Sequence, residues 1–321
     1  MLSAMTQVAR VVVGIAALLA SACSSSGDDE GSGQNASSRP SAGCGASSVS
    51  PDPTNPVFHI THDGVEREYK LHVPPSYDGT KPMRLVVNFH GLTSNMDQQI
   101  VFSGMDATAD AQGFIVAYPN GLPNPGGTTQ SWNAGACCAF GDTTRDDVGF
   151  TRAVVADIES RACIDERRVF ATGMSNGGFM SHMLGCEAAD LFTAVAPVAG
   201  GLGIPTCNPS RPIPIIAFHG TADTLVAYDG GGIAGASIPD TLQGWATRNG
   251  CSSGPTETFR NGTAHCDTWT GCSGGVMVRL CTLDGEGHCW PGTGFCPFGA
   301  FTTDISANDA MLAFFEPYAL P

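Results

Sequence analysis

The sequence predicts an α/β domain built around a largely parallel sheet. Short continuous apolar runs that end in a turn or a glycine recur along the chain, which is typical of strands buried on both faces of such a sheet. Helical stretches separate these runs, so the order of elements is that of successive βαβ units. The apolar runs are 84–91, 114–119, 168–174, 192–200 and 212–220.

The elements of the first half follow from local patterns. Two extended segments are expected within 57–74, around the turn His62-Asp63-Gly64, because VEREYKLHV alternates polar and apolar residues. A helix is expected from about Met96 to Gln112, between the first two buried strands. The segment 120–145 is rich in Gly, Asn and Thr, and a loop of this length is usually functional or cross-linked.

The second half begins with a well-marked helix. Asp146 and Asp147 stand where a first helical turn favours negative charge, and Phe150, Val154 and Ile158 then recur at four-residue spacing on one face. Later elements are expected as helices at 176–187, 238–249 and 306–315 and as extended, cysteine-bearing segments over 250–283.

The first 22 residues read as an export signal. Arg10 precedes the apolar run 11–19, and the small residues at 20–22 precede Cys23. This run is too short to span a bilayer as a mature helix. The pattern resembles a bacterial lipoprotein signal, which implies that Cys23 is lipidated and is the first mature residue. Ordinary cleavage with free secretion is the alternative.

A disordered tether is expected after the signal. Residues 23–50 are dominated by Ser, Gly, Asp, Asn and Pro and lack apolar periodicity, so they cannot bury enough surface to offset their ordering entropy. Without a second series of βαβ units or an internal repeat, 51–321 reads as one catalytic domain. We expect an extracellular or cell-surface monomer that contacts the membrane only through its lipid.

The overall composition describes a folded, acidic protein. Hydrophobic residues make up 42% of the chain and charged residues 14%, a balance typical of globular domains. Acidic residues outnumber Lys and Arg by 30 to 15, for a net charge of −15. This charge repels phosphate backbones and anionic headgroups, which excludes nucleic acid as a partner. It favours solubility and identifies no substrate.

Cysteines are numerous for a chain of this size. Setting Cys23 aside leaves twelve of the thirteen, an even number in a protein expected in an oxidising compartment, which predicts disulfides. Zinc is the competing interpretation, because Cys and His intermingle at 264–272 and 287–292. Neither segment has the paired close spacing of a structural zinc site, so we expect no metal and no cofactor.

The pattern G-x-S-x-G occurs at Gly173-Met174-Ser175-Asn176-Gly177. A strand-like run precedes it and a helix-like run follows, which is the context of a sharp turn that exposes a nucleophilic serine. Ser175 is therefore the predicted nucleophile of an α/β-hydrolase fold. The alternative is a structural turn without catalysis.

A serine nucleophile needs a base and an acid that orients the base, and in this fold the order along the chain is Ser, acid, His. Asp223 lies just past the apolar run 212–220, and His288 follows the strand-like run VMVRLCTL. These residues complete the predicted triad. Asp229 and Asp240 are the alternatives for the acid.

Two further positions bear on the same chemistry. His219 and His90 compete with His288 as the base, but each precedes a glycine at a strand end, where a buried, hydrogen-bonded histidine is expected. The oxyanion donors are expected to be the backbone N–H groups of Asn176 and Leu92. Thr93, one residue further, is the alternative to the second.

Several separated motifs together resemble the polyhydroxybutyrate depolymerase and feruloyl-esterase-related family of α/β hydrolases. The motifs are LHVPPSY, VVNFHG, SWNAGACC, DDVGF, RVFATGMSNGGFMSHMLGCE, FHGTAD and GHCWPG, within 57–318. The resemblance implies the same triad and oxyanion donors, and it implies that Trp290 and Trp132 line the substrate groove. Members often carry Cys where this chain has Leu92, and Thr or Ser where it has Cys289. A bridge from Cys289 to Cys296 that stiffens the loop of the base is a hypothesis.

The expected function is hydrolysis of carboxylic esters. The resemblance implies hydroxyalkanoate polymers or oligomers as substrates, with feruloyl or acetylxylan esters of plant cell walls as the alternative. No separate polymer-adhesion domain is recognised, which favours short esters or soluble oligomers. A surface binding protein with the same fold and no turnover is the alternative from another class.

Overall fold

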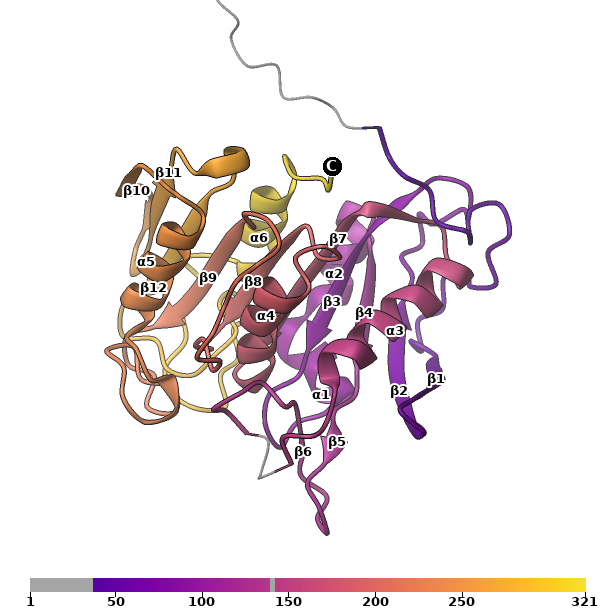
Figure 1. Ribbon diagram of the computed structural model, residues 1–321, viewed down its shortest axis with the longest axis horizontal. Helices are drawn as coiled ribbons and strands as arrows, with labels where there is room; N and C mark the ends of the chain where they lie inside the picture. The colour runs from indigo at the N-terminus through magenta and orange to yellow at the C-terminus, as the bar shows by residue number, and fades with distance from the viewer. Residues whose placement is uncertain (1–36, 139–141) are drawn as a thin grey trace, which may run out of the picture. The chain divides into compact units, whose positions relative to one another are not determined.

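A computed structural model describes residues 37–138 and 142–321. The expected signal, 1–22, and Cys23 lie outside the described residues. Ten strands of the described part form one sheet in the order β1-β2-β4-β3-β7-β8-β9-β12-β11-β10, and β5 pairs with β6 (Figure 1). The strands are β1 Val57–His62, β2 Val65–His72, β3 Met83–Phe89, β4 Ile115–Pro119, β5 Leu122–Pro123, β6 Gln130–Ser131, β7 Ile164–Met174, β8 Ala194–Val198, β9 Ile215–Gly220, β10 Ser253–Asn261, β11 Ala264–Thr270 and β12 Val278–Leu283.

The middle of the sheet is parallel and its two edges are antiparallel. Strands β4, β3, β7, β8, β9 and β12 pair in parallel. Strands β1 and β2 extend one side, and β11 and β10 extend the other, through antiparallel pairs. The predicted α/β class with a mostly parallel sheet is confirmed.

Helices cover both faces of this sheet (Figure 1). Residues of α3, α4 and α5 share one hydrophobic core, and residues of α1, α2 and α6 share the other. Within the described ranges, no helix is long and apolar enough to cross a membrane. The helices are α1 Met96–Ser103, α2 Met105–Gln112, α3 Asp147–Arg161, α4 Asn176–Glu187, α5 Ile238–Arg248 and α6 Ala307–Phe315, with short 3₁₀ turns at Gly232–Ala234 and Ser273–Gly275.

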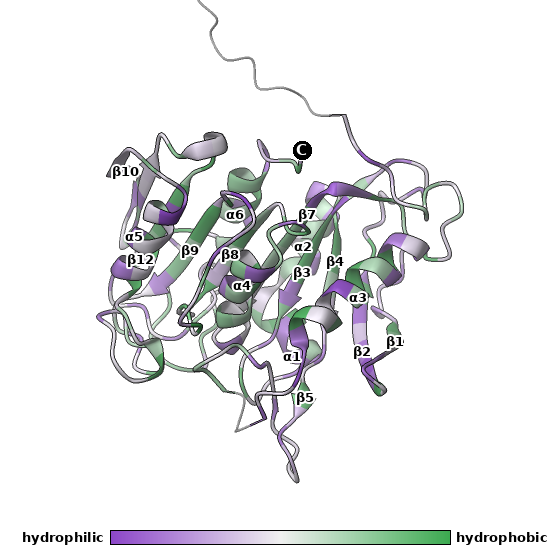
Figure 2. Ribbon diagram, in the orientation of Figure 1, coloured by the Kyte–Doolittle hydropathy of each residue, from purple (hydrophilic) through white to green (hydrophobic). Residues whose placement is uncertain are grey.

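Strand β3 illustrates why the apolar runs are continuous. Its Leu85, Val87 and Phe89 pack into the core under α3, α4 and α5, whereas Val86 packs into the core on the opposite face. Successive side chains of a strand point to opposite faces, so a strand covered on both faces is a nearly continuous apolar run. Figure 2 shows this hydrophobic character along the central strands β8 and β9.

The expected helix from Met96 to Gln112 is two helices. Gly104 separates α1 from α2 with φ 55°, and its N–H caps α1 by donating to the carbonyl of Ile100. A left-handed residue at this position ends a helix, and glycine adopts it without a Cβ clash.

The boundary expected for the tether, residue 50, is too late in the chain. Cys44 is disulfide-bonded to Cys163, and the N–H of Ser41 donates to the carbonyl of Ile164 at 3.0 Å. Ser41 is also buried, at 4% exposure. A polar composition predicted disorder here, but a covalent cross-link and backbone pairing to β7 hold this segment against the domain.

Six disulfides join the twelve cysteines that the composition left after Cys23. The predicted disulfides are confirmed, including the hypothesised bridge between Cys289 and Cys296. The zinc interpretation fails at 264–272, because Cys266 pairs with Cys281 and Cys272 pairs with Cys251. The remaining pairs are Cys44–Cys163, Cys137–Cys138 and Cys186–Cys207.

Candidate active site

Ser175 occupies a strained turn between β7 and α4. Its φ is 58° and its ψ is −121°, values that cost free energy for a residue with a Cβ and persist only where the surroundings impose them. The N–H of Ser175 donates to the carbonyl of Val198 at 2.9 Å, which fixes the turn against β8. The side chain therefore projects from the carboxyl end of β7 at the N-terminus of a helix.

Sterics explain the two glycines of the motif. A Cβ on Gly173 would lie 2.6 Å from the carbonyl oxygen of Phe89, and a Cβ on Gly177 would lie 2.1 Å from the same atom. Both distances are far below any van der Waals contact, so the strand, the turn and the helix can approach β3 this closely only with glycine at both positions.

The predicted acid and the predicted base are in direct contact. Nδ1 of His288 lies 2.7 Å from Oδ2 of Asp223, and both residues are buried, at 3% and 5% exposure. The other carboxylate oxygen accepts from the N–H groups of Leu225 and Val226, at 2.8 and 2.9 Å. Burial opposes ionisation of Asp223, but hydrogen bonds from His219 and His288 outweigh it and hold the pKa of Asp223 below its usual range.

The topology gathers these residues at one edge of the sheet. Ser175 follows β7, Asp223 follows β9 and His288 follows β12, and these strands are parallel with only β8 between the first two. The carboxyl ends of parallel strands meet at the same edge, where open α/β sheets bind ligands. Ser175 and His288 line one cavity there.

The backbone geometry favours the N–H of Leu92 over the N–H of Thr93 as an oxyanion donor. The N–H of Thr93 is already donated to the carbonyl of Gln130, at 3.1 Å, whereas Leu92 lines the cavity beside Ser175. His90 Nδ1 lies 2.7 Å from the carbonyl oxygen of Gly91. That carbonyl and the N–H of Leu92 belong to one peptide plane, so the bond to His90 also fixes the direction of this N–H.

The competing histidines have structural partners. His90 is fully buried, and its Nε2 accepts from the N–H of Gly121 at 2.9 Å. Burial lowers the pKa of His90 to about 4, so the ring is neutral and can accept this bond. His219 Nε2 lies 2.8 Å from the carbonyl oxygen of Val226 and 3.4 Å from Asp223 Oδ2, so its ring supports the acid.

The alternative acids lie at the surface. Asp229 and Asp240 are exposed, and Asp240 stands in the first turn of α5, where its N–H donates to the capping hydroxyl of Ser237. Neither side chain lines the cavity that holds Ser175 and His288.

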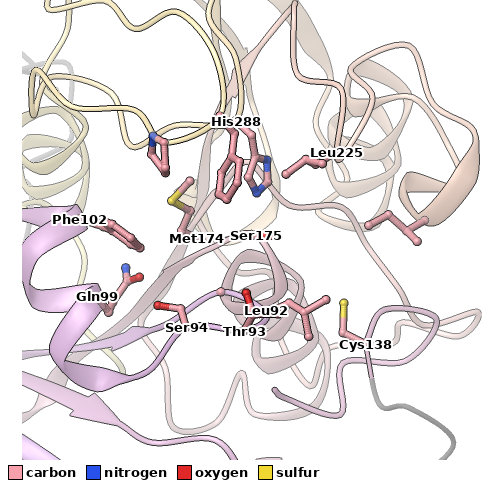
Figure 3. Close-up of a pocket in the computed structure, with 14 residues that line it drawn as sticks. Leu92, Thr93, Ser94, Gln99, Phe102, Cys138, Met174, Ser175, Leu225 and His288 are labelled. Carbon is pink, nitrogen blue, oxygen red and sulfur yellow. The ribbon is translucent and has the colours of Figure 1, made fainter. Parts of the chain in front are cut away.

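The cavity has a volume of about 240 Å³. Figure 3 shows Gln99, Phe102 and Ser94 on one side of it and Leu225 and Cys138 on the other, with His288 between them. Among the described residues, its lining carries no Asp, Glu, Lys or Arg, which is notable in so acidic a chain. The lining residues are Gly91, Leu92, Thr93, Ser94, Gln99, Phe102, Cys138, Met174, Ser175, Leu225, Ile233, His288, Pro297 and Phe298.

The two tryptophans expected in the groove lie elsewhere. Trp132 is fully buried, and its indole N–H donates to the carbonyl of His90 at 2.9 Å. Trp290 is 2% exposed, and its indole N–H donates to Asn308 Oδ1 at 3.0 Å. Neither lines the cavity. Both indoles instead brace segments that carry site residues, the loop after β3 and the loop of His288.

Sequence reasoning missed the side chains that form the cavity wall. Phe102 stacks on the half-exposed Phe295, with ring centroids 5.9 Å apart, and Phe298 is 55% exposed at the mouth. Cys138 reaches the wall through its bond to Cys137. The one available signal was the long loop 120–145, which was expected to be functional or cross-linked.

One cluster in the described part of the chain has the residue types of a metal site. His62, Asp63 and Asp146 bring ligand atoms within 4.8 Å of one another. Asp146 Oδ2 lies 3.3 Å from His62 Nε2, while its other oxygen caps α3 by accepting from Gly149. The helix cap formed by Asp146 and its contact with His62 explain why these side chains lie together without a metal ion.

Comparison with known proteins gives the family. The family described as "Esterase PHB depolymerase" matches residues 67–204. Feruloyl esterase B of Piromyces equi is 36% identical over 235 residues, which cover 69% of this chain but only 42% of that protein. Feruloyl esterase C of Emericella nidulans is 33% identical over 258 residues, which cover 77% of this chain and 83% of the relative.

Solved structures agree on the fold. An acetyl xylan esterase from Aspergillus awamori superposes with a TM-score of 0.58 at 18% identity, over 82% of this chain and 99% of that one. An S-formylglutathione hydrolase from Agrobacterium tumefaciens superposes with a TM-score of 0.55 at 14% identity, over 81% and 94%. The resemblance expected from the motifs is confirmed: this chain belongs to the polyhydroxybutyrate-depolymerase family of esterases, on an α/β-hydrolase fold.

Proposed function

We propose that this chain hydrolyses carboxylic esters through an acyl-enzyme. Ser175 attacks the ester carbonyl while His288 takes its proton and then passes it to the leaving alcohol. Asp223 holds the imidazole with its proton on Nδ1, which leaves Nε2 as the base. The N–H groups of Leu92 and Asn176 stabilise the oxyanion, and water then releases the acyl group by the same steps.

One observation carries this proposal. His288 lies 2.7 Å from the buried Asp223 and lines the same cavity as Ser175. The backbone of Ser175 is held at a positive φ. A structural turn has no need of this strain, and a buried acid–imidazole pair that reaches the cavity of a strained serine is the arrangement that activates a serine nucleophile. Together these features favour turnover over a binding protein with the same fold.

The decisive experiment compares the wild-type domain with Ser175→Ala and His288→Asn on p-nitrophenyl butyrate. Each substitution is expected to lower kcat by about 10³-fold or more, because the two groups act as a unit. His59→Asn is the matched control, since His59 is solvent-exposed on β1. Activity that survived Ser175→Ala would refute the nucleophile, and a wild-type protein inactive on every ester would favour the binding-protein alternative.

For the substrate, we propose hydroxyalkanoate esters first and feruloyl or acetylxylan esters as the alternative. The wall formed by Phe102, Leu225, Ile233 and Phe298 suits an apolar or aryl group. Without a cation in its lining, the cavity offers little to an anionic substrate. Parallel assays on 3-hydroxybutyrate oligomers, methyl ferulate and acetylated xylan distinguish the two classes.

We also propose that the protein is exported and acts outside the cell. Six disulfides fit an oxidising compartment. In this proposal, residues 1–22 are removed, Cys23 carries a lipid, and a short tether leads to a monomeric catalytic domain. In a detergent phase-partitioning experiment, the Cys23→Ser variant is expected in the aqueous phase and the lipidated wild type in the detergent phase. Light scattering tests the monomer.

A further inference from the structure

Two buried polar atoms in the cavity wall have no hydrogen-bond partner in the part of the chain that the structure describes. Gln99 is fully buried and Ser94 is 8% exposed, and neither Gln99 Oε1 nor Ser94 Oγ has a hydrogen-bond partner among the described residues. Both side chains line the cavity of Ser175, on the side where Phe102 lies (Figure 3). A buried polar atom without a partner costs free energy, so such an atom calls for an explanation.

The neighbours of Gln99 decide which end of its amide faces the cavity. Its Nε2 donates to Asn88 Oδ1 at 2.8 Å, and Asn88 Nδ2 in turn lies 3.6 Å from Met105 Sδ. A thioether can only accept a hydrogen bond, which directs the NH₂ group of Asn88 towards the sulfur and its oxygen towards Gln99. The carbonyl oxygen of Gln99 is the end left for the cavity.

The position of Ser94 relates this polar pair to the reacting ester. Ser94 lies two residues after Leu92, the expected donor to the ester's carbonyl oxygen, and its own N–H donates to the carbonyl of Gly91 at 3.2 Å. Gln99 follows in α1, which begins directly after this turn. The two unpartnered atoms therefore belong to the segment that holds the carbonyl side of the substrate.

We propose that Ser94 and Gln99 form a subsite for a hydroxyl group on the acyl part of the substrate. The hydroxyl donates to Gln99 Oε1 and accepts from the hydroxyl of Ser94, which satisfies both atoms at once. A carboxylate would meet the Gln99 oxygen with no cation in the lining, and an ammonium would find no carboxylate there. Phe102 supplies an apolar wall for the carbon skeleton. This inference rests on the proposed esterase activity and narrows its substrate to hydroxylated acyl esters.

The test compares matched esters that differ by one hydroxyl. The aliphatic pair is p-nitrophenyl 3-hydroxybutyrate and p-nitrophenyl butyrate, and the phenolic pair is methyl 4-hydroxycinnamate and methyl cinnamate. The wild type is expected to favour the hydroxylated member of one pair by roughly tenfold or more in kcat/KM. An ester without the hydroxyl would leave Ser94 Oγ and Gln99 Oε1 buried and unpaired in the complex. The pair that shows the preference identifies an aliphatic or a phenolic hydroxyl as the ligand.

Two variants assign the preference to these residues. Ser94→Ala removes a hydroxyl that has no hydrogen-bond partner within 37–138 and 142–321, so folding should be unaffected, and Gln99→Met removes the acceptor. Each should erase the preference, because kcat/KM should fall more for the hydroxylated ester than for its unhydroxylated partner. Gln98→Met is the matched control, because Gln98 is exposed on the same helix. Since Gln99→Met also takes the donor from Asn88, Ser94→Ala is the primary variant.

The outcomes separate this inference from the proposed function. Turnover without a hydroxyl preference, or a preference that survives both variants, would overturn the subsite and leave the esterase standing. A preference confined to the alcohol part, seen with 2-hydroxyethyl butyrate over ethyl butyrate, would overturn its assignment to the acyl side. No turnover of any of these esters would overturn both proposals.

Discussion

Oδ2 of Asp223 lies 2.7 Å from Nδ1 of His288, while Oδ1 of the same carboxylate accepts from two backbone N–H groups. The acid is thereby fixed on both sides before any substrate binds. In the proposed mechanism, a carboxylate held in this way keeps the imidazole proton on Nδ1 and stabilises the imidazolium that forms when His288 accepts a proton. Burial opposes ionisation of Asp223, but hydrogen bonds from His219 and His288 outweigh it, so the pKa of this carboxyl lies below its usual range and the carboxylate is ionised near neutral pH.

Asp223→Asn should lower kcat by about 10³- to 10⁴-fold with little change in KM, because an amide can place its NH₂ against Nδ1 and hold the wrong tautomer. Steady-state kinetics on p-nitrophenyl butyrate measure the effect. Asp229→Asn is the control, since Asp229 is exposed and is the nearest alternative acid in the sequence. A larger loss in the Asp229 variant would reassign the acid.

Gly177→Ala should abolish activity and lower the yield of folded protein, because its Cβ would lie 2.1 Å from the carbonyl oxygen of Phe89. Gly185→Ala, two turns further along α4, is the matched control. A Cβ there meets side-chain atoms of Trp245 and Val195 at 3.3 Å, and alanine is the better helix former. Thermal unfolding measures the stability of both variants, and kcat/KM measures their activity. An active Gly177→Ala protein would mean that the approach of α4 to β3 is not required.

The positions of the three residues of the proposed triad could be predicted because they depend on local pattern and chain order. The glycines around Ser175 are dictated by close backbone contacts, and the positions of Asp223 and His288 follow from strands that end at one edge of the sheet. Each of these requirements leaves a trace in a few consecutive residues. The buried strands were predicted for the same reason, since a strand covered on both faces is a nearly continuous apolar run.

The cavity wall could not be predicted, because it depends on contacts between distant segments. Trp290 sits two residues from the base, yet Asn308 in α6 binds its indole and draws it into the core. Trp132 is likewise held by the carbonyl of His90. Gln99 carries no local sign of a site, and its proposed role rests on its bond to Asn88 and on a carbonyl oxygen without a partner among the described residues.

Removing the disulfide between Cys289 and Cys296 should impair catalysis as well as stability. It closes the loop directly after His288, whose N–H donates to the carbonyl of Phe298 at 3.0 Å. The Cys289→Ala/Cys296→Ala variant should lose about 2 kcal/mol of stability by the loop-entropy relation. It should also lose several-fold in kcat, because the base is held less firmly.

The disulfide between Cys251 and Cys272 provides the comparison. It joins the end of α5 to the turn after β11 and closes a longer loop, so its double alanine variant should lose about 3 kcal/mol. Its kcat should be unchanged, because neither cysteine lines the cavity. An unchanged kcat in the Cys289→Ala/Cys296→Ala variant would show that the loop of His288 needs no covalent closure.

Glu286 should make stability fall as the pH rises towards neutrality. Its side chain is 2% exposed, and burial raises its pKa to about 7, although the N–H of Thr302 donates to it at 2.8 Å. The folded chain therefore keeps a proton that the unfolded chain releases near its ordinary pKa of 4.5. The stability that this group contributes is fully present below about pH 4.5 and is lost as the pH passes through about 7. Glu286→Gln keeps an acceptor for Thr302 and cannot ionise, so it should raise stability by about 2 kcal/mol at pH 8 and hardly at all at pH 5. Thermal unfolding at both pH values measures this, and an equal change in Tm at the two would contradict it.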